Sequence, residues 1–129
     1  MKKVCVCLVL FVFGMALCAQ NASALPPFSK EWKGKYLEGN ANAKFVEAAT
    51  TANCNVCHQS TDRKMRNAYG MALSKYLTKA KYQEVKDDEA AAKKYILDGL
   101  DKVAAEKNGS GKSYGELIKA GQLPSGDTK

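Results

Sequence analysis

The chain has 129 residues and a formal net charge of +7 at pH 7. This length suits one folded domain rather than two. Lysines are spread along the chain and no platform of interleaved basic and aromatic residues stands out, which argues against a nucleic-acid-binding protein.

Residues 1–24 have the pattern of a secretory signal peptide. Lys2 and Lys3 precede the uncharged apolar run Val4–Ala19, and small residues follow it. The run is shorter than the ~20 apolar residues of a membrane-spanning helix, which disfavours a retained anchor. We therefore expect cleavage after Ala24, no permanent membrane anchor, and a periplasmic or otherwise exported product.

Removal of this segment leaves few reactive side chains. Three of the five cysteines leave with it: Cys5, Cys7 and Cys18. The remainder keeps Cys54, Cys57 and the only histidine, His58, within five consecutive residues. A disulfide between cysteines three residues apart closes a very small loop and adds little stability, which disfavours a purely structural role for the pair.

Residues 25–39 are predicted to be an extended N-terminal segment, because Pro26 and Pro27 disfavour a helix and Gly34 and Gly39 interrupt the stretch. The apolar side chains of this segment are expected to cover the core: Phe28, Trp32, Tyr36 and Leu37.

The segment before the cysteine pair is predicted to be a helix over residues 41–52. Asn40 can cap its N-terminus, and Phe45, Val46 and Ala49 form an apolar stripe. The cysteine pair follows this helix directly.

A second helix is predicted over residues 64–80, with Thr61 or Asp62 as its cap. Its apolar residues recur at helical spacing: Met65, Tyr69, Ala72, Leu73, Tyr76 and Leu77. Gly70 weakens this helix by about 1 kcal/mol relative to alanine, unless another segment packs closely there.

Two further helices follow. The third is predicted over residues 88–107, and its buried stripe is Ala92, Ile96, Leu100 and Val103. The fourth is short: Ser113 and Glu116 form a capping box, Gly121 can end the helix and Pro124 follows.

These elements predict an all-α fold of three main helices and one short helix, because no alternating strand pattern is found. The folded domain is expected to cover residues 40–124, and the tail 125–129 to be frayed. Isolated helices of this length are marginal, so they must share a core.

The sequence Cys54-Asn55-Val56-Cys57-His58 has the C-x-x-C-H spacing of a haem-attachment motif. Its two thiols can add across the two vinyl groups of a haem and form thioethers along one edge of the ring. The adjacent His58 can then place its ring under the iron, since histidine is a common axial ligand. We expect a backbone carbonyl to hold the second ring nitrogen of this histidine.

With this motif, the helix before it and the export signal, the chain resembles the short exported monohaem c-type cytochromes of bacteria. The resemblance implies one covalent haem c at the centre of the helical domain. It also implies a single-haem electron carrier that cycles between Fe(III) and Fe(II), rather than an enzyme. We expect the chain to be a monomer.

The charge of the mature chain bears on its partner. Without Lys2 and Lys3 it has 18 Lys plus Arg against 13 Asp plus Glu, a net charge of +5. Steering toward an acidic redox partner protein is one reading of this charge, and an ordinary solvated surface is the other.

The sixth iron ligand is less defined. Many c-type cytochromes supply a methionine from further along the chain, and here only Met65 and Met71 follow, 7 and 13 residues after His58. Met71 is the preferred candidate because it lies off the apolar stripe of its predicted helix, whereas Met65 lies on the stripe and is expected in the core. A lysine, water or no ligand stays open.

Three alternatives use the same residues. Without a strong sixth ligand, the haem could bind a small gas or sense redox state. Cys54 and Cys57 could serve a thiol-disulfide oxidoreductase, although such enzymes carry the pair after a strand of an α/β fold. Together with His58 they offer three zinc ligands, whereas a structural zinc site needs four.

Overall fold

The computed structural model describes residues 25–60 and 62–126. In chain order its helices are α1 (Pro26–Tyr36), α2 (Ala43–Ala52), the short 3₁₀ helix η1 (Asn53–Val56), α3 (Ala68–Tyr76), α4 (Lys79–Val85), α5 (Glu89–Ala105) and α6 (Tyr114–Lys119). These residues form two isolated β-bridges and no strand, which confirms the all-α class. The predicted signal peptide, the Thr61 cap and residues 127–129 lie outside the described residues.

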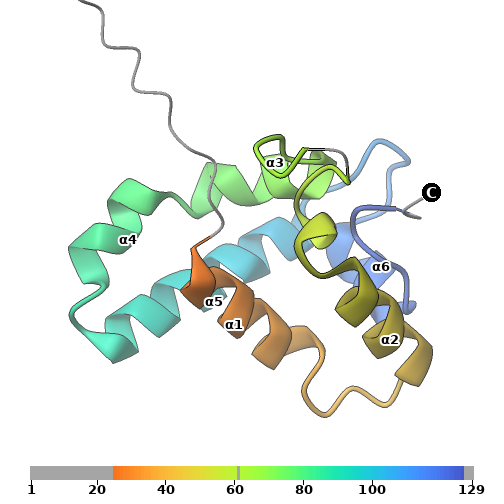
Figure 1. Cartoon of the computed structure of the whole chain (residues 1–129), viewed down its shortest axis with the longest axis horizontal. Coiled ribbons are helices and arrows are strands. Elements are labelled where there is room, and N and C mark those ends of the chain that lie inside the picture. Colours follow the sequence, from red (N-terminus) through yellow and green to blue (C-terminus); the bar gives the residue numbers. More distant parts are fainter. Residues whose placement is uncertain (1–24, 61, 127–129) are drawn as a thin grey trace, which may run out of the picture.

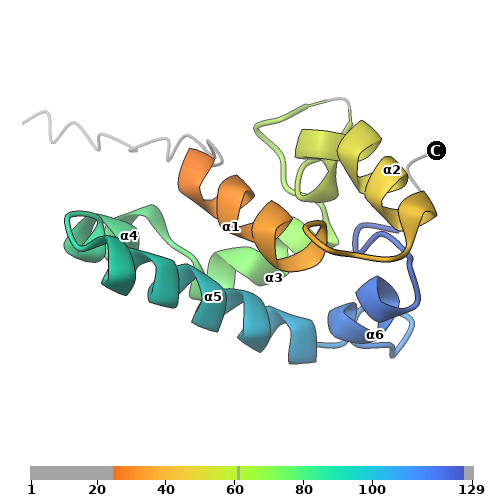
Figure 2. The same ribbon diagram turned by 90° about the horizontal axis from the view of Figure 1, so that it is seen from below.

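Helix α5 is the element against which most of the other helices pack. It contacts α1, α3, α4 and α6, and Figure 2 shows it along one side of the molecule with α4 and α6 at its two ends. Its predicted range of 88–107 is confirmed to within two residues, and the Asp88 side chain caps it by accepting from the Ala91 N–H. Gly99 allows a close approach here, because a Cβ on it would lie 2.3 Å from Leu77 Cδ2.

The prediction of an extended segment at residues 25–39 is wrong, because α1 occupies most of it. Pro26 and Pro27 stand at the first two helical positions, where a backbone N–H has no intrahelical partner and its loss costs nothing. Trp32 is buried and Tyr36, four residues later, packs on the same core. The prolines therefore start this helix, and its apolar face packs across α5 (Figure 1).

Helix α2 begins two residues later than predicted. Asn42, and not Asn40, is its cap: the Asn42 side chain accepts from the Phe45 N–H at 3.1 Å. The Asn40 side chain instead accepts from the Asn42 N–H at 2.8 Å and shapes the approach to the helix. Phe45 and Ala49 of the predicted apolar stripe are buried in the core, whereas Val46 is only partly buried.

The single helix predicted over residues 64–80 is also wrong, because α3 and α4 divide that region. Asp62 does not cap it: its side chain accepts from the Lys64 N–H at 2.8 Å and makes a turn in a loop. Asn67 caps α3. Met65 lies in the loop and is 53% exposed, so its predicted place in the core is wrong too.

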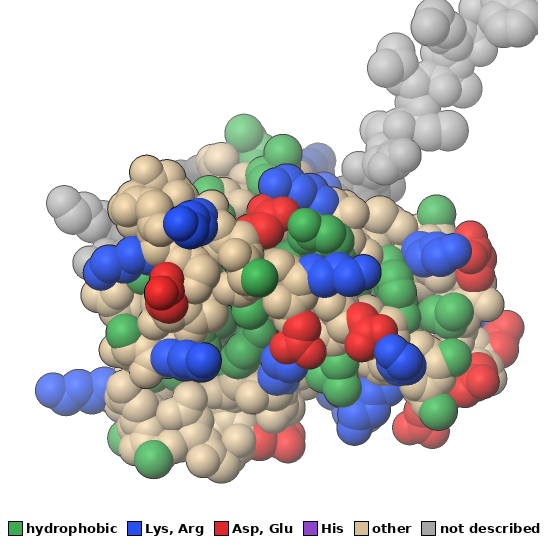
Figure 3. Space-filling model, turned by 180° about the vertical axis from the view of Figure 1, so that it is seen from behind, with side chains coloured by type: hydrophobic (Ala, Val, Ile, Leu, Met, Phe, Trp, Pro, Cys, Tyr) green, Lys and Arg blue, Asp and Glu red, His purple; other side chains and the backbone are tan. Residues whose placement is uncertain are grey.

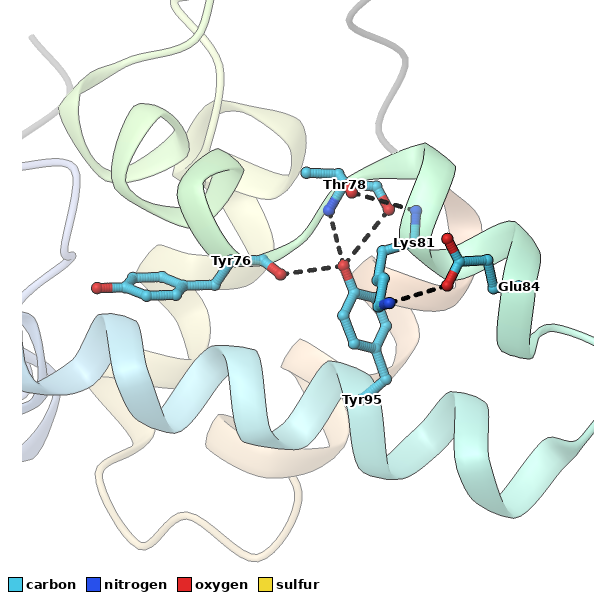
Figure 4. Close-up of polar contacts among 5 residues, drawn as sticks. All are labelled: Tyr76, Thr78, Lys81, Glu84 and Tyr95. Carbon is cyan, nitrogen blue, oxygen red and sulfur yellow. Dashed lines mark hydrogen bonds and ion pairs between the residues drawn. The ribbon is translucent and has the colours of Figure 1, made fainter.

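A hydroxyl from α5 holds the break between α3 and α4 (Figure 4). Tyr95 Oη donates to the carbonyl of Tyr76 at 3.0 Å and accepts from the Thr78 N–H at 2.9 Å. Thr78 then caps α4, its side chain accepting from the Lys81 N–H. These bonds satisfy the backbone groups that an interrupted helix leaves unpaired.

The last helix forms as expected. The Ser113 and Glu116 capping box is present at the start of α6, and Gly121 has a φ of +75° just after it ends. Tyr114 of this helix packs edge-on against Tyr69 at 5.0 Å, and Tyr69 Oη accepts a buried hydrogen bond from Trp32 Nε1 at 2.9 Å. One aromatic cluster therefore joins α1, α3 and α6.

None of the helices in residues 25–60 and 62–126 combines the length and the apolar character that crossing a membrane requires.

Candidate functional site

The cysteine motif lies in a tight turn at the end of α2. Asn53 ends that helix with a φ of +47°, and η1 follows it. The Cys54 carbonyl then accepts from the N–H groups of Cys57 at 3.2 Å and His58 at 3.0 Å. Both thiols are free and partly buried, on either side of a single turn of chain.

His58 is buried, with 6% of its surface exposed. Its Nδ1 is also buried and has no hydrogen-bond partner, so the expected bond from this ring to a backbone carbonyl is not formed at that atom. A buried polar atom without a partner costs about 1–3 kcal/mol. The ring therefore retains a coordinating or hydrogen-bonding capacity that the surrounding protein does not use.

The side chain of Asn67 docks on the backbone of the motif. Its Nδ2 lies 3.0 Å from the carbonyl oxygen of Asn55, 3.1 Å from that of Val56 and 3.3 Å from that of His58. Its backbone N–H donates to the Cys57 carbonyl at 3.0 Å. Four consecutive carbonyls of the turn are thus directed at one residue.

Gly70, three residues after Asn67, also packs closely against the motif. Its N–H donates to Asn67 Oδ1 at 2.9 Å, and a Cβ on it would lie only 2.0 Å from the Cys57 carbonyl oxygen. The close packing that would explain a glycine within a helix is therefore present, and the motif supplies it. Sequence reasoning missed Asn67, although a capping residue type just before the apolar Tyr69 and Ala72 was a usable signal.

Neither methionine is brought into the core. Met65 is 53% exposed and Met71 is 56% exposed. The Met65 carbonyl accepts from the Gln59 N–H at 2.9 Å, so this loop folds back beside the motif. Met71 lies on α3, next in sequence to the Gly70 contact with Cys57.

The Cys57 thiol is poorly suited to act as the nucleophile of thiol-disulfide exchange. Burial, with a smaller contribution from Cys54, raises the pKa of the Cys57 thiol to about 12. Exchange catalysts need a thiolate and hence a lowered thiol pKa. The described residues also contain no strand that could begin a thioredoxin-like fold.

A structural zinc site is not supported by the arrangement of the possible ligands. Among residues 25–60 and 62–126, no three His, Cys, Asp or Glu side chains converge as a metal site. A covalent haem makes a different demand: two thiols one turn apart and one imidazole with a free ring nitrogen. The motif meets this requirement in residue type and in spacing. Cys54 and Cys57 supply the free thiols, and His58 supplies the imidazole with its unpartnered Nδ1.

Comparison of the chain with protein-family models, curated proteins and solved structures gives no significant match.

Proposed function

We propose that this chain is an exported single-haem c-type electron carrier. The observation that carries the proposal is the docked turn, in which Cys54, Cys57 and His58 are adjacent, both thiols are free and a buried ring nitrogen has no partner. The pattern of residues 1–24 supports export.

The residues of the turn have distinct roles in this proposal. Cys54 and Cys57 would hold the haem: each thiol would add its S–H across one vinyl double bond, so that a C–S bond and a C–H bond form and no atom leaves. His58 would bind its iron. When bound, the haem would supply one-electron chemistry between Fe(III) and Fe(II), by which the protein carries an electron from a donor protein to an acceptor protein. The chain holds the group, limits water at it and sets its potential.

Met71 is our candidate for the sixth ligand, with Met65 second. Both belong to the segment that returns from the motif into α3, which keeps them close to His58 along the chain. Because both side chains are more than half exposed, recruiting either one requires it to leave solvent.

An acidic redox protein is the proposed partner. Arg63, Lys64 and Arg66 are exposed on the loop between the motif and α3. On the face shown in Figure 3, basic and acidic side chains are interspersed. The loop therefore offers a local positive surface beside the motif, and its attraction for a partner should weaken with salt.

The exposure of Met65 and Met71 also favours a second function. If neither methionine reaches the iron, an open coordination site remains that can bind a small gas or respond to redox state. The same turn, thiols and histidine would hold the haem in either case.

Visible absorption spectra distinguish the two functions. The protein is expressed with a cytochrome c maturation system and measured oxidised, reduced with dithionite, and reduced under carbon monoxide. The electron carrier predicts sharp reduced bands that carbon monoxide barely changes, and Met71→Ala should make the iron reactive toward it. Met65→Ala is the matched control and should leave the spectra unchanged. Reduced bands of the wild type that shift at once under carbon monoxide would instead favour the open-site function.

A further inference from the structure

We infer that Asn67 is the positioning residue of the motif: its carboxamide fixes the backbone that joins the two thiols to His58. The three carbonyls within reach of Nδ2 belong to Asn55, Val56 and His58. They lie 9 to 12 residues earlier in the chain, so these bonds are a tertiary contact and not a local turn.

The amide has a role that helix capping does not require. Asn67 Oδ1 caps α3 through the Gly70 N–H, and serine or aspartate would cap a helix about as well. Of these three capping residues, only asparagine adds two N–H donors on the same side chain, and here these are shared among three carbonyl oxygens. The choice of asparagine is therefore explained by the motif rather than by the helix.

Asn67 restricts His58 through two backbone carbonyls. The His58 carbonyl bonds the Asn67 side chain, and the preceding carbonyl, of Cys57, bonds the Asn67 N–H. The peptide groups on both sides of the His58 Cα are thereby held, and the direction of its Cα–Cβ bond with them. The effect on a bound haem rests on the proposed function, whereas the effect on the turn does not.

Two variants distinguish the contact of the Asn67 amide with the motif from the capping of α3 by its oxygen. Asn67→Ser keeps a capping oxygen and removes the amide without adding charge. Asn67→Asp keeps the cap and replaces the donors by a carboxylate facing carbonyl oxygens. The matched control is Asn42→Ser, the same change at the cap of α2, where the side chain also accepts from a backbone N–H three residues on.

The first measurement uses the full chain without haem, under reducing conditions. The alkylation rate of Cys54 and Cys57 is measured at temperatures equally far below each variant's unfolding midpoint. Both Asn67 variants should react at least fivefold faster than wild type, and Asn42→Ser should stay within twofold. Equal alkylation rates in Asn67→Ser and Asn42→Ser would contradict the proposal that the Asn67 amide holds the turn.

The second measurement uses haem-loaded protein and tests whether Asn67 positions His58. The midpoint potential and the reduced visible bands should change in Asn67→Ser and stay as in wild type in Asn42→Ser. Faster alkylation with an unchanged potential and spectrum would overturn the positioning of His58. A wild-type chain that takes up no haem would contradict the proposed function, while the alkylation rates would still decide whether Asn67 holds the turn.

Discussion

At the scale of single residues, Gly70 is the clearest constraint on the site. Gly70→Ala should destabilise the fold, because the new Cβ would lie 2.0 Å from the Cys57 carbonyl oxygen and the packed turn would have to shift, at a cost of about 1–3 kcal/mol. Alanine regains about 1 kcal/mol of helix propensity, so the net loss should be up to about 2 kcal/mol. Urea unfolding measures the difference.

Gly34 of α1 provides the matched control. A Cβ there would meet only the Glu38 carboxylate, at 3.8 Å or more. Gly34→Ala should therefore stabilise the protein by up to about 1 kcal/mol through helix propensity. Equal effects of the two substitutions would show that Gly70 is not held against the motif.

The haem-attachment pattern could be recognised in the sequence, but the contacts that hold its residues in place could not. Cys54, Cys57 and His58 are recognisable because the haem-attachment pattern is local and five residues long. The role of Asn67 depends on bonds to residues 9 to 12 positions earlier, which exist only once α3 docks on the turn. The solvent exposure of Met65 likewise follows from where α3 begins, which local spacing did not reveal.

At the scale of elements, one hydroxyl decides where α3 ends. Tyr95→Phe should lower the free energy of unfolding by about 1–2 kcal/mol, because the Tyr76 carbonyl and the Thr78 N–H lose their partner. Chemical denaturation gives the value. Tyr82→Phe is the control, since it keeps the edge-on ring contact with Phe28 at 5.4 Å. A loss in the Tyr95 variant no larger than in the control would contradict this role.

Helical spacing predicted the elements that local signals define and failed where tertiary contacts intervene. The helix over 88–107 and the capping box at Ser113 were found because stripe and caps lie within the element itself. The break after Tyr76 was missed because the hydroxyl that holds it comes from another helix. The sequence does not predict α1, because proline disfavours the interior of a helix, whereas Pro26 and Pro27 stand at the first helical positions, where proline is favourable.

At the scale of the whole molecule, the motif lies at the inner end of α2. In both ribbon views, α2 and α6 lie at the end of the molecule opposite α4, and α2 runs from that end toward the middle, where the motif follows it (Figures 1 and 2). The prediction of an all-α domain is confirmed, although the described residues form six α-helices and one short 3₁₀ helix rather than three main helices and one short one. The wrapping of these helices around a haem belongs to the proposal.

Covalent attachment of haem through the two thiols is the central claim, and the intact mass of the denatured protein tests it most directly. The mature chain, co-expressed with the maturation system and extracted with acid-acetone, should keep the added mass of one haem. Cys54→Ala combined with Cys57→Ala should lose that mass, while His58→Ala should shift the visible spectrum. A wild-type mass equal to that of the bare polypeptide, or haem that stays attached in the double variant, would contradict the claim.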